Sequence, residues 1–249
     1  MKAQELETRM REYESFRSVL IRSDAWTVIR LDGRAFTQFT ALRFRKPYDE
    51  RLRDFIIEAT SALMQGFQAI YCYTFSDEIS AVFAPGWDLF NRRHEKLISL
   101  SAGLVSSVFT HACGEPSHFD SRIWQCERRE EVIDYFRWRQ CDAARCALHG
   151  WCYWTLRQAG LSSETVVDML AGKNKDEQKA LLHQYGIDFD QVPSWQRHGV
   201  GLYWEDYAKS GYDPIKAQAV EAERRRIKIQ LQLVSGKAYS QFLHDLLLY

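Results

Sequence analysis

The sequence lacks the short motifs that announce several large enzyme classes. It has no GxxxxGK[ST] phosphate loop, no GxSxG nucleophile elbow and no HExxH zinc motif. Its six cysteines form no Cys-x-x-Cys pair and no Cys/His spacing suited to zinc. These absences argue against P-loop, α/β-hydrolase and zinc chemistry. Reduced thiols are the simplest interpretation of the cysteines, so we expect a cytoplasmic protein.

Net charge and long apolar runs are also missing. The 33 basic and 33 acidic residues balance to zero, so no global field indicates a polyanionic partner, although a local basic surface remains open. The start is charged and no apolar run approaches a membrane span, so no membrane association is expected. What is present is 46% hydrophobic and 14% aromatic residues over 249 positions. That suffices for one substantial domain, or one with a smaller helical appendage.

The first half alternates strand and helix patterns in a recognisable order. A helix over 4–20 is followed by strands at 26–31, 69–74, 79–83 and 119–124, with helices from Asp49 to about Gly66 and from about 89 to 111. Residues 33–48 are predicted to form an extended loop. The order βαββαβ predicts a ferredoxin-like sheet in an α+β fold, with the first and third strands as antiparallel neighbours.

After about residue 130 the pattern becomes helical. A long aromatic-rich helix is predicted from 131 to 158, shorter helices begin near 162 and 176, and 201–205 favours a strand or hairpin. We therefore expect one α+β domain at 1–130 and a mainly helical region at 131–249 that packs on it.

Two carboxylates lie at the tips of hydrophobic strands in this topology. Asp32 ends the first strand and Asp77 precedes the third, so pairing of these strands brings both acids together. Two carboxylates about 4 Å apart repel by roughly 4 kcal/mol at an effective dielectric near 20. Divalent cations relieve that repulsion, and Mg²⁺ favours one or two carboxylates completed by phosphates and water. The prediction is a site for two Mg²⁺ ions, formed by Asp32, Asp77 and the Gly33 carbonyl. The alternative is that Asp-Gly and Ser-Asp-Glu are ordinary turns.

Other charged residues near this edge have open interpretations. Glu78 is either an auxiliary ligand or a solvated charge, because its side chain should face away from that of Asp77. In the coarse topology, basic and hydroxyl groups suited to a triphosphate fall near the same edge: Lys46, Arg51, Ser76, Arg92, Arg93 and Lys96. A solvated helix face is the alternative for the last three.

Several blocks in order resemble the tRNA(His) guanylyltransferase family. They are Arg30–Phe36, Lys46–Arg51, Ser76–Glu78, Arg92–Lys96, Phe119–Arg122, Trp138–Asp142 and Trp195–Trp204. The resemblance spans nearly all of residues 1–214. It implies that 1–130 is a palm-type catalytic domain and that 131–249 provides RNA or oligomer contacts. Such a protein adds nucleotides in the 3′–5′ direction to the 5′-end of tRNA, after activation of the RNA 5′-phosphate by ATP and with GTP as the incoming nucleotide.

The resemblance also implies roles by position. Asp32, Asp77 and Glu78 would be catalytic, with Asp32, Gly33 and Asp77 as metal ligands. The nucleotide would contact Asp32, Gly33, Arg34, Ala35, Phe36, Thr37, Lys46, Ser76, Asp77, Arg93 and Lys96. A homotetramer or homodimer is implied as well.

One stretch departs from the family members dedicated to tRNA(His). Those resemble each other in a His-Ile-Asn-Asn-like segment, where this chain reads Ala144–His149. The departure favours the guanylyltransferase-like branch, whose activity is 5′-end repair of tRNA, over addition of G at position −1 of tRNA(His). Two other classes remain as alternatives: a palm-type nucleotide cyclase and a non-catalytic RNA-binding protein.

Overall fold

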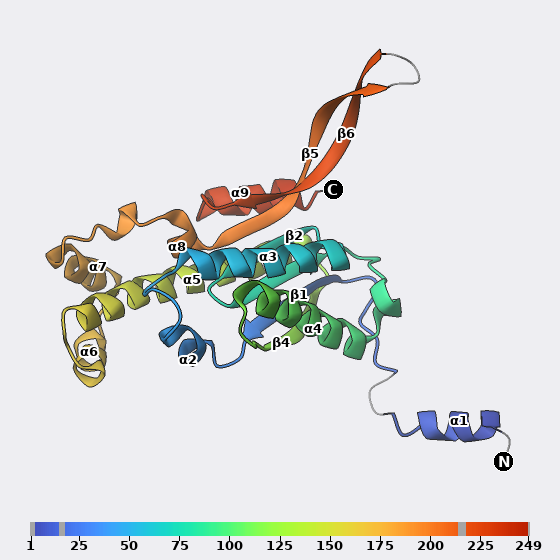
Figure 1. Ribbon diagram of the computed structural model, residues 1–249, viewed down its shortest axis with the longest axis horizontal. Helices are drawn as coiled ribbons and strands as arrows, with labels where there is room; N and C mark the ends of the chain where they lie inside the picture. Colours follow the sequence, from blue (N-terminus) through green and yellow to red (C-terminus); the bar gives the residue numbers. More distant parts are fainter. Residues whose placement is uncertain (1–2, 15–17, 214–217, 249) are drawn as a thin grey trace.

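A computed structural model describes residues 3–14, 18–213 and 218–248. Its centre is a six-stranded sheet in the order β4-β1-β3-β2-β5-β6 (Figure 1). The strands are β1 (Trp26–Gly33), β2 (Tyr71–Phe75), β3 (Glu78–Phe83), β4 (Phe119–Cys126), β5 (Val200–Asp213) and β6 (Gln218–Gln230). The helices are α1 (Ala3–Arg11), α2 (Phe36–Ala41), α3 (Glu50–Phe67), α4 (His94–Cys113), α5 (Arg129–Gln158), α6 (Ser163–Leu170), α7 (Lys175–Gln184), α8 (Ser194–His198) and α9 (Lys237–Leu246), with 3₁₀ turns at Leu89–Arg92 and Phe189–Gln191.

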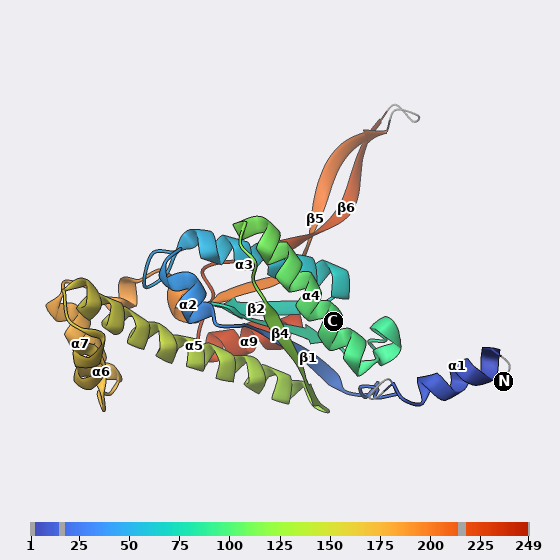
Figure 2. The ribbon, with the colours of Figure 1, turned by 60° about the horizontal axis from the view of Figure 1, so that its bottom comes forward.

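The predicted ferredoxin-like core is confirmed. Strand β1 pairs antiparallel with β3 on one side and with β4 on the other, and β2 pairs with β3. The crossover helices α3 and α4 cover one face, as Figure 2 shows. Alternate β1 residues Ile29 and Leu31 face those helices and are fully buried in one core cluster.

Helix α3 forms where its sequence signals place it. Asp49 has extended backbone geometry and its side chain accepts the backbone N–H of Arg51, which caps the helix. One side of the helix is apolar and buried, including Ile56, Leu63 and Met64. Gln68 ends the helix in the left-handed conformation.

The opposite face of the sheet is covered by α5 and α9 (Figure 2). Val28, Val82 and Tyr71 face this layer and pack with Phe136 of α5 and Leu243 of α9. The outer half of α5 extends beyond the sheet and forms a third cluster with α6, α7 and the segment around Phe189. The helical region therefore shares its longest helix with the core of the sheet.

The sequence indicated either a single strand or a hairpin at 201–205. The structure has a hairpin, formed by β5 and β6. Only Val200–Tyr203 of β5 pairs with β2, whereas β5 and β6 pair with each other from Gly201 and Gln230 outward. The ribbon projects from the body (Figure 1). Of the apolar residues at the C-terminal end, Leu247 is buried and Leu248 is exposed, while Tyr249 lies outside the described residues.

Three sequence predictions need correction. The N-terminal helix ends at Arg11 instead of residue 20, and residues 15–17 lie outside the described part. The predicted loop 33–48 contains the short helix α2. Helix α4 begins at His94 instead of 89, because Phe90 and its two successors adopt positive φ angles.

Helix α4 also corrects the expectation about membrane spans. By length and composition alone it is apolar enough to cross a membrane. It packs on the sheet, however, where Leu97, Val105 and Phe109 are fully buried in the core. Burial against α3 and β4 accounts for its apolar character.

Replacing Asp49 by Ala should destabilise the fold in a pH-dependent way. The Arg51 side chain, with the backbone N–H groups of Arg45 and Arg51, lowers the pKa of Asp49 from 3.8 to about 2. Because the pKa is lower in the folded state, this stabilisation is complete above pH 4 and disappears as the pH falls towards 2. We expect a loss of about 1–2 kcal/mol in unfolding free energy at pH 7, measured by urea denaturation.

The matched control is Asp54→Ala on the same helix, where the side chain is exposed and pairs with its neighbour Arg53 at 2.8 Å. It should change stability little. A difference between Asp49→Ala and wild type that stays constant from pH 7 to pH 3 would contradict the capping account.

Candidate active site

Pairing of β1 with β3 brings three acidic residues to one edge of the sheet. Leu31 is opposite Ile79, so Asp32 lies beside the turn that joins β2 to β3. Ser76 and Asp77 form that turn, and Ser76 adopts the left-handed conformation. Asp32, Asp77 and Glu78 line one cavity of about 260 Å³, here called the carboxylate cavity.

The electrostatics of Asp77 show a carboxylate in an unfavourable place. Burial raises its pKa, and the charges of Asp32 and Glu78 raise it further. The Ser76 hydroxyl donates a hydrogen bond to it at 3.0 Å and partly offsets these effects. Asp77 therefore lowers the stability of the fold at neutral pH, which is typical of a group placed for binding.

Asp32 is held between two guanidinium groups. Arg30, two residues earlier on the same face of β1, donates through Nε at 3.1 Å. Arg122 of β4 approaches the same carboxylate oxygen at 3.1 Å and also binds Asp120. Both arginines were absent from the predicted site, although Arg30 and Arg122 each lie in a block that carried the family resemblance.

Glu78 is neither solvated nor free to act as an open ligand. It points to the face covered by α5, where it pairs with Arg139, and the Arg139 Nε atom donates at 2.6 Å. Only 14% of the Glu78 side chain is exposed. Glu78 is two residues before Ser80, which pairs with Arg30, so Glu78 lies on the same face of the sheet as Arg30 and Asp32.

A second cavity, here called the aromatic pocket, adjoins the carboxylate cavity. It has a volume of about 220 Å³, and Tyr48, Phe75, Ser76 and Asp77 line both cavities. Its other walls include Phe36, Thr37, Phe44, Lys46, Arg53, Ile56, Trp154 and Trp195. Rings and a few cations suit a flat heterocycle and its phosphates.

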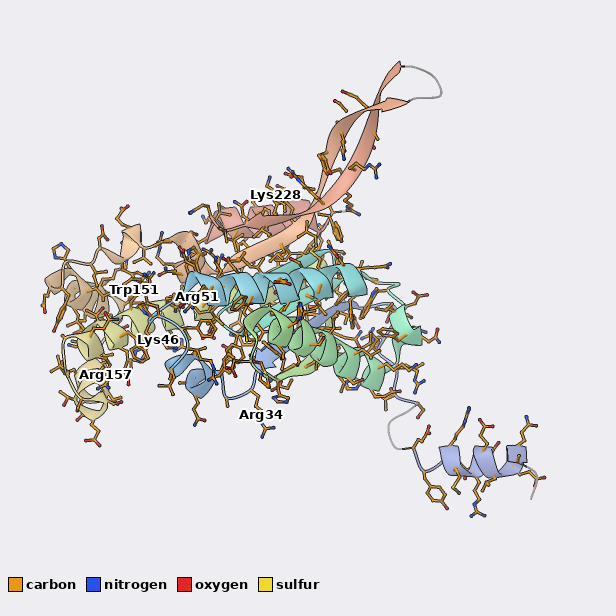
Figure 3. All side chains as sticks on the ribbon, viewed as in Figure 1. Arg34, Lys46, Arg51, Trp151, Arg157 and Lys228 are labelled. Carbon is orange, nitrogen blue, oxygen red and sulfur yellow. The ribbon has the colours of Figure 1, made fainter. Side chains whose placement is uncertain are left out.

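Lys46 is one of the cations that line this pocket. Its ammonium group lies 2.6 Å from the Thr40 hydroxyl and 5.5 Å from the centre of the Trp154 ring. Burial lowers its pKa, while the Asp77 charge acts in the opposite direction. Figure 3 shows Lys46 between α2 and the outer half of α5. A phosphate at the Asp77 end of the pocket would lie within its reach.

The structure separates some of the predicted nucleotide contacts from the cavities. Phe36 and Thr37 line the aromatic pocket, whereas Arg34 and Ala35 are exposed and line neither cavity. Arg34 points away from the body in Figure 3. Gly33 is required beside Phe36, because a Cβ atom there would lie 2.2 Å from its ring.

Arg93 and Lys96 lie at the opposite end of the sheet, which corrects their predicted position. Arg93 forms a β-bridge with Leu20, and the Arg92 carbonyl accepts a hydrogen bond from the Ile21 N–H, five residues before β1 begins at Trp26. Trp26 and Asp32 are six positions apart in β1, a span of roughly 20 Å. The coarse topology failed because α4 starts where β3 ends, away from the carboxylates.

The remaining predicted cation, Arg51, is also engaged elsewhere. It pairs with Asp49 at 3.0 Å and donates to the Arg43 carbonyl, and it lines neither cavity. A pocket cation that the sequence reasoning missed is Arg53, which lies over the Trp195 ring at 4.7 Å. The sequence around Arg53 gave no signal for this contact, because Trp195 belongs to α8, far along the chain.

The donor set fits divalent cations. Asp77 is disfavoured as an isolated anion, and Asp32 already attracts two positive groups. Within residues 3–14, 18–213 and 218–248, no group of three or more His, Cys, Asp or Glu side chains is arranged around a common point. Two carboxylates completed by phosphate and water are the coordination that Mg²⁺ accepts.

A ferredoxin-like sheet with paired carboxylates beside an aromatic pocket defines a palm-like domain with a candidate nucleotide site. Family comparison agrees: residues 7–127 match the model described as tRNAHis guanylyltransferase, and residues 130–238 match the Thg1 C-terminal domain. A Drosophila melanogaster relative named probable tRNA(His) guanylyltransferase is 30% identical over 205 residues, covering 78% of this chain and 71% of the relative. The chain belongs to the tRNAHis guanylyltransferase family.

The curated relatives differ in length. This chain covers 91% of a probable tRNA(His) guanylyltransferase from Dictyostelium discoideum at 26% identity, with 90% of this chain aligned. It covers only 40% and 35% of two Arabidopsis thaliana relatives, tRNA(His) guanylyltransferases 1 and 2, at 27% and 30% identity with 85% and 72% of this chain aligned.

Solved structures share the fold. A bacterial Thg1-like protein in complex with GTP superimposes with a TM-score of 0.74 at 23% identity, covering 98% of this chain and all of the other. The tRNA(His) guanylyltransferase from Saccharomyces cerevisiae gives 0.71 at 24% identity, covering 77% and 90%.

The positions of Lys46 and Lys96 lead to opposite expectations. Lys46→Met should weaken binding of GTP or ATP about tenfold, because it removes a cation from the aromatic pocket. Lys96→Met should leave the affinity unchanged. Quenching of tryptophan fluorescence measures both, since Trp154 and Trp195 line the pocket. An equal loss in the two variants would restore the role that the sequence assigned to Lys96.

Proposed function

We propose that this chain is a Mg²⁺-dependent nucleotidyltransferase that adds nucleotides in the 3′–5′ direction to the 5′-end of tRNA. The observation that carries the proposal is the meeting of Asp32 and Asp77 beside the aromatic pocket, in a chain of the tRNAHis guanylyltransferase family. Phosphoryl transfer is accomplished mainly by positioning and by electrostatic stabilisation. Both requirements are addressed by the groups at this edge of the sheet.

Each group has a proposed part. The aromatic pocket holds the base of a nucleoside triphosphate, with Tyr48, Trp154 and Trp195 among its walls. Lys46 binds the phosphates at the Asp77 end. Asp32 and Asp77, with the Gly33 carbonyl, would hold two Mg²⁺ ions. When bound, such ions neutralise charge on the reacting phosphates and lower the pKa of an attacking hydroxyl.

The proposed reaction has two nucleotidyl transfers. An oxygen of the RNA 5′-phosphate attacks the α-phosphorus of ATP, and pyrophosphate leaves. The 3′-hydroxyl of GTP then attacks the activated RNA phosphorus, which forms a phosphodiester bond and releases AMP. Structures of bacterial Thg1-like proteins have been solved with GTP and with ATP, which supports both nucleotides as substrates here.

The helical region and the hairpin are proposed to position the RNA. The sequence Ala144–His149 departs from the members dedicated to tRNA(His), so 5′-end repair is favoured over addition of G at position −1. A homodimer or homotetramer is proposed as the working form. Phosphate contacts would make tRNA binding weaken with rising salt.

Asp77→Asn should separate catalysis from stability. The substitution removes a metal ligand, so we expect transfer of labelled GTP to a tRNA lacking its first nucleotide to fall at least 100-fold. It also removes a carboxylate whose pKa is raised in the folded state, so the melting temperature should hold or rise at pH 7.

The assay includes intact tRNA and a reaction without RNA. Persistence of transfer in Asp77→Asn would refute the two-carboxylate mechanism. Formation of a cyclic nucleotide by the wild-type protein in the reaction without RNA would instead indicate a cyclase.

A further inference from the structure

Arg139 of α5 is the most deeply buried cation at the carboxylate cavity. Only 7% of the residue is exposed. Its guanidinium forms a two-point contact with Glu78, donates to Asp142 at 3.1 Å and lies 4.4 Å from the centre of the Trp138 ring. A buried guanidinium that is fully engaged in this way has a fixed orientation.

The contact joins two separate parts of the fold. Glu78 is the first residue of β3 and follows Asp77 directly, whereas Arg139 belongs to the helix on the opposite layer. The Thr74 hydroxyl donates to the Glu78 carbonyl at 2.7 Å. The turn that carries Asp77 is thus fixed on the β2 side by Thr74 and on the α5 side by Arg139.

The contact also determines which carboxylates in the cavity carry a charge that the protein leaves uncompensated. Glu78 pairs with Arg139, and Asp142, which also lines the cavity, pairs with Arg139 and Arg145, so Asp32 and Asp77 are the acids left to face bound cations. Arg30 lies 3.9 Å from Glu78 and 3.1 Å from Asp32, so the fixed position of Glu78 also limits where Arg30 can lie. Without Arg139, Glu78 would lose its two-point partner and keep the longer 3.9 Å contact with Arg30, as a third buried carboxylate beside Asp77.

We propose that Arg139 is a positioning residue for metal and nucleotide binding, acting through Glu78 to hold Asp77 in its place opposite Asp32. This inference rests on the proposed function and extends it to the C-terminal half of the chain. It makes docking of α5 a condition for a working site. Arg139 touches neither the metal nor the substrate in this role.

The test measures Mn²⁺ binding by electron paramagnetic resonance, in the presence of a non-hydrolysable GTP analogue. Arg139→Met should weaken Mn²⁺ binding at least tenfold, because Glu78 loses its partner and the Asp77 turn loses its anchor. Arg139→Lys keeps the charge without the two-point fork, so we expect about a threefold loss. In transfer assays the Mg²⁺ concentration for half-maximal rate should rise in the same order.

Tyr135→Phe is the matched control. Tyr135 lies one turn earlier on α5, and its hydroxyl is 3.0 Å from that of Ser80 on β3. The control therefore weakens the same α5–β3 interface without touching Glu78. It should lower the melting temperature and leave Mn²⁺ affinity within twofold of wild type.

Normal Mn²⁺ affinity in folded Arg139→Met would overturn the inference, as would an equal loss in Tyr135→Phe. If Arg139→Met does not fold, Arg139→Lys decides, and normal affinity in that variant overturns it. The failure of the proposed function looks different: wild type would bind Mn²⁺ in an Arg139-dependent way yet transfer no nucleotide to any tRNA.

Discussion

The pairing of β1 with β3 is the constraint on which the site depends. It places Asp32 beside the Ser76–Asp77 turn, although 45 positions separate the two acids in the chain. Burial of Asp77, and to a lesser extent the charges of Asp32 and Glu78, raise its pKa, so an ionised Asp77 works against the fold. The buried apolar cores on both faces of the sheet hold the acids together in spite of it.

Three arginines contact the acids at this site, and they compensate the charge of Asp32 more than that of Asp77. Asp32 is contacted by Arg30 and Arg122, and Glu78 by Arg139, whereas Asp77 accepts hydrogen bonds from the Ser76 hydroxyl and its own backbone N–H and forms no ion pair within the described part of the chain. Asp77 is therefore the acid whose charge is least compensated by the protein. A bound cation would gain most at that carboxylate, which lies where the two cavities meet.

The sequence was sufficient for the core of this arrangement and insufficient for its surroundings. Periodicity and the Asp49 cap located α3, and the order of strands located Asp32 relative to Asp77. Such local signals could not place Arg139 against Glu78, because that contact joins residues 61 positions apart across two layers.

The errors have a similar origin. Arg93 and Lys96 were predicted at the wrong end of the sheet. Helix α4 begins at the end of the sheet where β3 ends, and the coarse topology did not take this chain direction into account. The aromatic pocket draws Tyr48, Trp154 and Trp195 from three separate segments, so no spacing in the sequence indicated it.

A crystal structure with Mn²⁺ and a GTP analogue would test the central claim most directly, through the anomalous scattering of manganese. The account predicts anomalous peaks between the carboxylates of Asp32 and Asp77, with the triphosphate extending from there towards Lys46. Manganese or triphosphate bound instead near Arg93 and Lys96, with the two acids left empty, would contradict it.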